Sequence, residues 1–245
     1  MWQLLLAIMS RITLNDFFSA YQGLPWQQEA VQLLQQAMPE SLLQDSSHWV
    51  EKFREGPPTP EPVEGRVTPE LMEALTGHPA ESFNAAFCND FNAMLQETGF
   101  DQHTDAFRML MANLMHESCN FVYMKEIDPG HYLEGRTDLG NTQPGDGPKF
   151  RGCGPLQVTG RVHHTAFSDW LKSKGINEPN ILNIGTDWTA DHYPFQIAIS
   201  WITNNGLLNV CLNQGFEACC VRINGGYNGY DDRVAKYEIC KRVIQ

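Results

Sequence analysis

Apolar residues recur at three- and four-residue spacing along most of this chain, which is the spacing of one face of an α-helix. The pattern predicts helices over residues 83–98 and 104–118 and a further helix-rich part from Thr165 to the end. Residues 68–70 (Thr-Pro-Glu) are typical of a helix start, because a capping residue, a proline and an acid follow one another. No segment shows the alternating series of apolar and polar residues that strands produce. The sequence therefore predicts a mainly α fold.

The same pattern divides the chain into parts. Residues 1–55 have apolar positions at helical spacing and are expected to form a small N-terminal helical module. Residues 56–66 contain four prolines. Because proline fixes φ and removes a backbone donor, this stretch is expected to be an extended linker. Residues 67–245 then form the main domain.

Composition narrows the class of protein. The chain has 42% hydrophobic and 19% charged residues, as folded globular proteins do. Its net charge of −12 argues against nucleic acid as a partner, because phosphate backbones attract clusters of Lys and Arg. The seven cysteines are odd in number and include no Cys-x-x-Cys pair, so mostly reduced, buried thiols are expected. The first apolar run is shorter than the ~20 residues of a membrane span and lacks a basic start, so neither stable membrane insertion nor a signal peptide is expected.

The helix predicted at residues 104–118 ends in a candidate catalytic acid. Glu117 lies three residues after Leu114 and seven after Leu110, so its carboxylate continues the apolar stripe of this helix. Burial disfavours the charged form of a carboxylate, and a general acid that works near neutral pH needs this property. The alternative is a glutamate at a fraying helix end that points to water.

Acid–base cleavage of a glycosidic bond uses a second carboxylate, and the candidates are Glu126, Asp128, Glu134, Asp138 and Asp146. Nine helical steps would place Glu126 on the face opposite Glu117, so the helix must end between the two if they are to converge. The stretch that follows, residues 132–161, is rich in glycine and polar side chains. A loop of this length inside a compact domain is often functional.

Taken in order, these segments resemble the family-19 chitinase-like glycoside hydrolases, and among them the bacteriophage endolysins. The matching segments are His116-Glu117-Ser118, residues 132–136 (Tyr-Leu-Glu-Gly-Arg), 138–141 (Asp-Leu-Gly-Asn), 145–147 (Gly-Asp-Gly), 150–152 (Phe-Arg-Gly), 156–161 (Leu-Gln-Val-Thr-Gly-Arg), 223–226 (Ile-Asn-Gly-Gly) and Asp232-Arg233. Each piece is weak alone, but the order and spacing of the set are specific. The resemblance covers residues 67–245.

The resemblance implies a lysozyme-like, two-lobed helical fold in which residues 67–245 are the catalytic domain. It implies that Glu117 is the general acid and that Glu126, as in the endolysin subgroup, is the second catalytic carboxylate. In plant chitinases the base lies further along the chain, which leaves Glu134 as a rival. The positions implied in binding substrate or holding the attacking water are Tyr132, Glu134, Gln157, Thr159, Asn224 and Arg233.

The chain departs from the family pattern at three positions. Cys153 stands where the family usually has arginine, His163 where plant members have asparagine, and Cys119 where glycine usually follows the His-Glu-Ser motif. These departures bear on subsite strength and loop geometry and leave both carboxylates in place. The resemblance implies no cofactor and no metal, and His163-His164 has no further ligand at a suitable spacing.

Three functions are compatible with these residues. The first is a monomeric endolysin that cleaves β-1,4 bonds of peptidoglycan glycan strands by an inverting acid/base mechanism. It would wait in the host cytoplasm until a holin opens the membrane, and its N-terminal module would be a candidate for cell-wall binding. The second is a chitinase acting on β-1,4 N-acetylglucosamine polymers. The third is a non-catalytic wall-binding or virion structural protein, which the retention of Glu117 and Glu126 disfavours.

Overall fold

The computed structural model describes residues 65–176 and 180–245, together with Gln32 and Gln36. The predicted N-terminal module and most of the predicted linker lie outside these residues, so both stay predictions. The described residues from 65 onward belong to one compact unit, and every helix given below lies in it.

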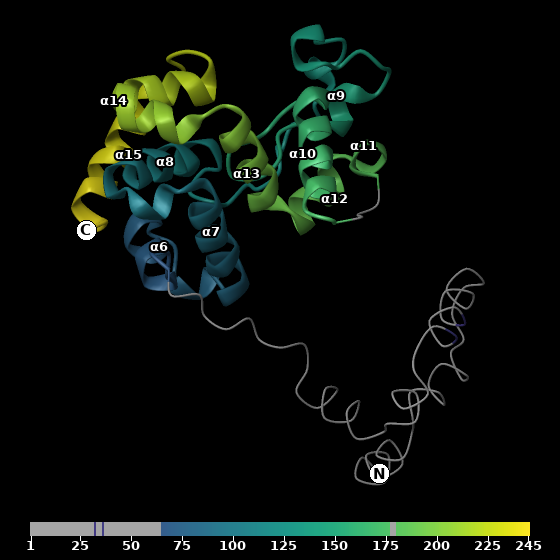
Figure 1. The fold of residues 1–245 in the computed structure, drawn as a ribbon. Helices are drawn as coiled ribbons and strands as arrows, with labels where there is room; N and C mark the ends of the chain where they lie inside the picture. The colour runs from purple at the N-terminus through teal and green to yellow at the C-terminus, as the bar shows by residue number, and fades with distance from the viewer. Residues whose placement is uncertain (1–31, 33–35, 37–64, 177–179) are drawn as a thin grey trace. The chain divides into compact units, whose positions relative to one another are not determined.

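The described part of the chain is helical, which confirms the mainly α prediction (Figure 1). Its α-helices are α6 (Pro69–Thr76), α7 (Ala85–Thr98), α8 (Thr104–Glu117), α9 (Asp146–Lys149), α10 (Arg161–Ser173), α11 (Ile181–Ile184), α12 (Thr186–His192), α13 (Pro194–Asn204), α14 (Leu207–Asn224) and α15 (Tyr230–Val243). The 3-10 helices are η1 (Ala80–Ser82), η2 (Phe100–Gln102), η3 (His131–Leu133) and η4 (Thr137–Leu139). Among the described residues, pairing between extended segments is limited to the bridges Lys125–Cys153 and Cys153–Val158. None of the described helices is long and apolar enough to span a bilayer.

Capping residues set the helix boundaries. The Thr68 hydroxyl accepts the Leu71 N–H at 3.2 Å and α6 begins at Pro69, as the sequence predicts. Asn84 caps α7 by accepting the N–H of Phe87 at 2.9 Å, so this helix begins two residues later than its apolar pattern suggests.

Helix α8 is deeply buried along its second half. The sequence predicts one apolar stripe along it, whereas every residue from Met109 to Met115 is buried. Helices α14 and α15 both pack against it. The buried residues include Asn113, whose side-chain N–H groups donate to the Met109 carbonyl and the Cys219 sulfur. A helix covered on all sides has little freedom to tilt, which fixes the position of the residue at its end.

The helices of this unit fall into two groups (Figure 1). Helices α6, α7, α8, α14 and α15 lie together, α9, α10, α11 and α12 form the second group, and α13 lies between them. Contacts of α13 with α7 on one side and with α10 on the other join the groups.

The long connection after α8 is more ordered than its sequence indicates. The sequence predicts a loop over residues 132–161, whereas the structure has η3, η4 and α9 in this part of the chain. Buried Asn141 anchors it by donating to the Leu133 carbonyl at 3.0 Å and accepting the Arg161 N–H at 2.9 Å. Asp146, 1% exposed, binds the Arg161 guanidinium through both carboxylate oxygens. These polar contacts stabilise the loop beside its buried apolar residues, Leu133 and Phe150.

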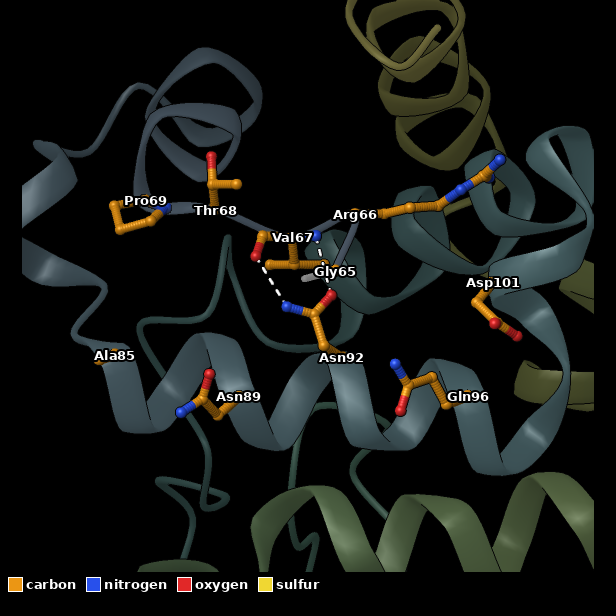
Figure 2. Close-up of a pocket in the computed structure, with 10 residues that line it drawn as sticks. All are labelled: Gly65, Arg66, Val67, Thr68, Pro69, Ala85, Asn89, Asn92, Gln96 and Asp101. Carbon is orange, nitrogen blue, oxygen red and sulfur yellow. Dashed lines mark hydrogen bonds between the residues drawn. The ribbon is translucent and has the colours of Figure 1, made fainter. Parts of the chain in front are cut away.

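A cavity of about 670 Å³ lies between α7 and the first described residues of the chain (Figure 2). Asn92 spans it, accepting the Val67 N–H at 2.9 Å and donating to the Val67 carbonyl at 2.8 Å. Arg66, at the end of the predicted linker, donates to Thr104 at 2.7 Å. The lining residues are Gly65, Arg66, Val67, Thr68, Pro69, Ala85, Asn89, Asn92, Gln96 and Asp101, and none is a predicted site residue.

Replacing Asn92 with leucine should lower the free energy of unfolding by about 2 kcal/mol, because it leaves both buried backbone groups of Val67 without a partner. Asn89, one turn earlier, is a matched control, since its side-chain nitrogen has no hydrogen-bond partner in the described structure. Asn89→Leu should not lower the stability, because no hydrogen bond of its side-chain nitrogen is lost. Urea denaturation followed by circular dichroism measures both. Equal losses in the two variants would contradict the assigned role of Asn92.

Candidate active site

Glu117 is the last residue of α8, and its carboxylate meets a buried guanidinium. Arg233 Nη2 lies 2.5 Å from Glu117 Oε1, and Arg233 is 1% exposed. The same guanidinium donates from Nη1 to Asn113 Oδ1 at 2.8 Å and from Nε to the Asn228 carbonyl at 3.4 Å. Removing a charge from water is costly unless its donors are satisfied. The guanidinium therefore fixes the orientation of the Glu117 side chain, which keeps 19% of its surface exposed.

A second pair of side chains also joins α8 and α15, and each of its members lies one residue before Glu117 or Arg233. His116 Nδ1 lies 2.6 Å from Asp232 Oδ2. Burial alone would raise the pKa of Asp232, but the hydrogen bond from His116 and the charge of Lys236 lower it. Gly229, at φ 69°, packs against the imidazole, where a Cβ atom would lie 2.2 Å from His116 Cε1. Helices α8 and α15 are thus held in register by two adjacent pairs.

The chain leaves α8 through a left-handed turn. Residues 119–121 have φ angles of 49°, 59° and 66°. The Ser118 hydroxyl stabilises the turn by donating to the Leu114 carbonyl at 2.6 Å and accepting the N–H three residues further on at 2.9 Å. Glycine suits such φ angles, so Cys119 occupies a backbone position for which the family's usual glycine is better adapted. The turn ends the helix before Glu126, as convergence of the two carboxylates requires.

A cavity of about 500 Å³ opens beside this turn. Its lining residues are His78, Met115, His116, Cys119, Asn120, Val122, Tyr123, Asp232 and Lys236. Val122 and Tyr123 are 53% and 42% exposed. The space next to the end of α8 therefore combines charged groups with an exposed aromatic ring.

Glu126 lies in an extended segment that pairs with residues 152–153. Its N–H donates to the Gly152 carbonyl at 3.0 Å, and the Gly152 N–H donates to Glu126 Oε2 at 2.7 Å. The Tyr132 hydroxyl donates to Oε1 at 2.6 Å. Partial burial, together with this hydrogen bond and the charge of Glu126, raises the pKa of Tyr132 to about 12. The phenol therefore stays protonated and remains a donor to the carboxylate.

Gln157 lies beside this segment, and its side-chain nitrogen donates to the Tyr123 carbonyl at 3.3 Å. Gly152 separates Glu126 from Gln157, because a Cβ atom on it would lie 3.2 Å from Glu126 Cβ and 2.5 Å from Gln157 Oε1. The Thr159 hydroxyl donates to the Gln157 carbonyl at 2.8 Å. The structure thus brings Glu126, Tyr132 and Gln157 together, and Thr159 contacts the backbone of Gln157.

Glu134 and Asn224 lie in different surroundings. Both carboxylate oxygens of Glu134 accept backbone N–H groups, from Gly145 at 2.6 Å and from Gly147 at 2.8 Å. This carboxylate therefore binds the N-terminal end of α9. Asn224 is the last residue of α14 and is half-buried. The substrate-binding roles predicted for both residues stay predictions.

Two of the residues that depart from the family pattern, Cys153 and His163, have side-chain pKa values shifted by burial. Cys153 is fully buried, and burial raises the pKa of its thiol. Burial also lowers the pKa of His163. Its neighbour His164 is buried between the Gly160 carbonyl and the Thr186 hydroxyl, and burial lowers its pKa to about 4. Within the described ranges no group of three or more His, Cys, Asp or Glu is arranged to hold a metal ion.

Two residues that bind arginines near the predicted carboxylates were missed in the sequence. Asn113 carried no signal beyond a polar residue inside an apolar helix, yet it binds Arg233. Asp187 lies outside every motif, but it binds Arg151, which lies within one. Both contacts join residues far apart along the chain, so spacing could not have indicated them.

The helical architecture is shared with a chitinase C, known from the crystal structure of a mutant. The two align with a TM-score of 0.51 and 18% sequence identity, over 74% of this chain and 93% of that chain. At this identity the likeness establishes the fold, which is the lysozyme-like helical fold that the sequence implied.

A sequence relative agrees with the same class. It is a protein of Haemophilus influenzae described as a glycosyl hydrolase family 19 domain-containing protein, which is 30% identical over 112 residues. The aligned residues are 46% of this chain and 51% of that protein, so the chain spans about half the length of this relative. No family model matches the chain. The similarity to family 19 is thus supported, and the phage subgroup stays a prediction.

Replacing Arg233 with lysine should lower the free energy of unfolding by about 2–3 kcal/mol, because an ammonium cannot reproduce the forked contacts of a buried guanidinium. Arg222→Lys is the matched control. Arg222 is exposed on α14 and donates to the Asn205 carbonyl, so its replacement should change stability by less than about 0.5 kcal/mol. Thermal and urea unfolding of both variants measure the difference. A loss in Arg233→Lys no larger than in the control would show that the buried pair contributes little.

Proposed function

We propose that the chain is a glycoside hydrolase that cleaves β-1,4 glycans, with Glu117 as general acid and Glu126 as general base. The observation that carries the proposal is the Glu117 carboxyl, fixed at the end of a buried helix by Arg233 and still partly exposed. A proton donor must be oriented toward the leaving oxygen. The guanidinium holds the Glu117 carboxyl group in one orientation, which meets this requirement.

The surroundings of Glu126 suit a group that activates water. Its carboxylate accepts one backbone N–H and the hydroxyl of Tyr132, a residue that is 61% exposed. An exposed phenol can swing aside or bind the same water as the carboxylate. Gln157 and Thr159 provide an amide and a hydroxyl on the neighbouring segment. These polar groups support the role of Glu126 as base.

Glu134 is the weaker candidate for the base. Each of its two oxygens accepts a backbone N–H, and both N–H groups belong to the start of α9. Proton uptake by that carboxylate would break contacts that order the loop. The difference between one fixed amide on Glu126 and two on Glu134 favours Glu126.

The substrate that we propose is the glycan strand of bacterial peptidoglycan, and the biological role is host-cell lysis by a bacteriophage endolysin. This finer proposal rests on the resemblance of the His-Glu-Ser segment and the following polar loop to that subgroup. The enzyme would act as a monomer, stored in the host cytoplasm until a holin permits access to the wall. The alternative substrate is chitin, which the fold likeness to a chitinase C favours. Mass spectrometry of digested peptidoglycan, run beside sugar release from colloidal chitin, distinguishes the two substrates.

Glu117→Gln should fold as the parent does and lose at least about a hundredfold in glycan cleavage, the scale expected when a general acid is removed. Glu126→Gln should lose a comparable factor. Glu134→Gln should be less stable than the parent protein but should keep most of its catalytic rate. Rates on purified peptidoglycan, with circular dichroism to check folding, give the comparison. Glu238→Gln, an exposed site on α15, serves as the control. If Glu117→Gln keeps more than about a tenth of the rate, the assignment of the acid is wrong.

Cleavage should proceed with inversion of the anomeric carbon. Carboxyl groups roughly 6.5–9.5 Å apart leave room for a water, whereas about 5–5.5 Å leads to a covalent intermediate and retention. The turn at residues 119–121 directs the chain away from Glu117 before it reaches Glu126, which favours the wider separation. Proton NMR of the first reducing ends, recorded before mutarotation, should show the α anomer from a β-linked substrate. A β product would exclude single displacement.

A further inference from the structure

Two cations flank Glu126 along the extended segment. Lys125 precedes it, and Arg151 Nε donates to the Glu126 carbonyl at 3.3 Å. Both side chains end at one carboxylate, that of Asp187 on α12. Arg151 Nη2 lies 2.5 Å from Asp187 Oδ1, and Lys125 Nζ lies 3.1 Å from the same oxygen. One exposed acid, 61 positions after Glu126, therefore binds both cations beside it.

The start of α12 also fixes the backbone that pairs with Glu126. The Thr186 hydroxyl donates to the Arg151 carbonyl at 2.7 Å. Gly185 fits closely against Lys149, where a Cβ atom would lie 2.4 Å from the carbonyl oxygen. Arg151 Nη1 donates to the Pro148 carbonyl at 2.8 Å. Because Gly152 follows directly and donates to the Glu126 carboxylate, movement of Arg151 would be transmitted to that carboxylate.

The charges around Glu126 come from several elements. Lys125 and Asp128 lie on its own segment, Tyr132 on η3, Arg151 on the paired segment, and Asp187 on α12. A hydrogen bond from Arg151 and, to a lesser degree, one from Lys125 lower the pKa of Asp187 against the opposing effect of burial, so this acid is ionised. Its charge offsets the two cations. Without it, the segment that carries Glu126 would have two uncompensated cations, and positive charge favours the ionised form of a carboxylate.

We propose that Asp187 is a positioning residue for Glu126, which neutralises Lys125 and Arg151 and holds the Arg151-Gly152 backbone against the carboxylate. The catalytic part of this inference rests on the proposed function, since it takes Glu126 as the base. The contact network and the charge balance stand independently of the reaction.

The test is Asp187→Asn, which keeps the shape of the side chain and removes its charge. The midpoint of the Glu126 carboxyl titration, followed by ¹³C NMR and assigned by the signal lost in Glu126→Gln, should fall by roughly half a pH unit, a modest value because Asp187 and Lys125 are partly exposed. With a glycan substrate, the acidic limb of the pH profile of kcat/KM should move to lower pH by the same amount. The plateau of kcat should fall severalfold with little change in KM.

Two further variants fix the interpretation. Lys125→Met removes one cation and should move the Glu126 midpoint upward, opposite in sign to Asp187→Asn. Asp169→Asn removes an equally exposed acid that pairs with Lys172 on α10, and it should move neither the midpoint nor the limb. Opposite shifts in the first two variants, with none in the third, support the proposal. An unchanged midpoint in Asp187→Asn, or an equal shift in Asp169→Asn, overturns it.

The NMR arm separates this inference from the proposed function. If the parent protein cleaves no glycan, the proposed function fails, and the two midpoint shifts still decide whether Asp187 governs the charge around Glu126. If Asp187→Asn does not fold, Lys125→Met alone decides: an upward shift supports the charge balance, and a midpoint that does not move overturns it.

Discussion

The buried guanidinium of Arg233 is the interaction on which the candidate site depends. A cation that is 1% exposed is stable only where its donors meet acceptors, and here these are Glu117, Asn113 and the Asn228 carbonyl. The acceptors come from two parts of α8 and from the turn before α15. One charge therefore links the buried helix α8, with the carboxylate at its end, to the last helix. The packing of α14 against Asn113, through Cys219, extends this link into the core.

The two candidate catalytic carboxylates are supported in different ways. Glu117 is attached to a helix buried on all sides, so its position is set by core packing. Glu126 lies on an extended segment whose support is a small number of backbone and side-chain hydrogen bonds. Segments with few apolar contacts open more easily than core helices. Under the proposed mechanism, the acid Glu117 is thus held rigidly, and the base Glu126 lies on a segment that can adjust more easily.

Much of the fold was predictable from the sequence, because helix capping and backbone geometry depend on neighbouring residues. Thr68-Pro69 and Gly99 set helix ends through capping and a left-handed φ, and both act within one turn of the chain. The all-round burial of α8 was not predictable, because Asn113 interrupts the apolar pattern and its partner lies 120 residues away. The same holds for Asp187, which meets Arg151 36 residues earlier. Such contacts follow from tertiary packing and leave no periodic signal.

The chain contains three glutamates that the sequence alone could rank only by resemblance, and their surroundings separate them by chemistry. Glu117 faces a fixed cation, Glu126 faces neutral donors with its neighbouring cations bound by Asp187, and Glu134 is held by two backbone amides. Environment, more than residue type, decides which carboxyl group gives up a proton and which accepts one. The guanidinium beside Glu117 fixes the direction of that carboxyl group, whereas the neutral donors on Glu126 include an exposed phenol that can release it or bind the same water. The proposed division of roles between Glu117 and Glu126 therefore rests on how each carboxyl group is held in place.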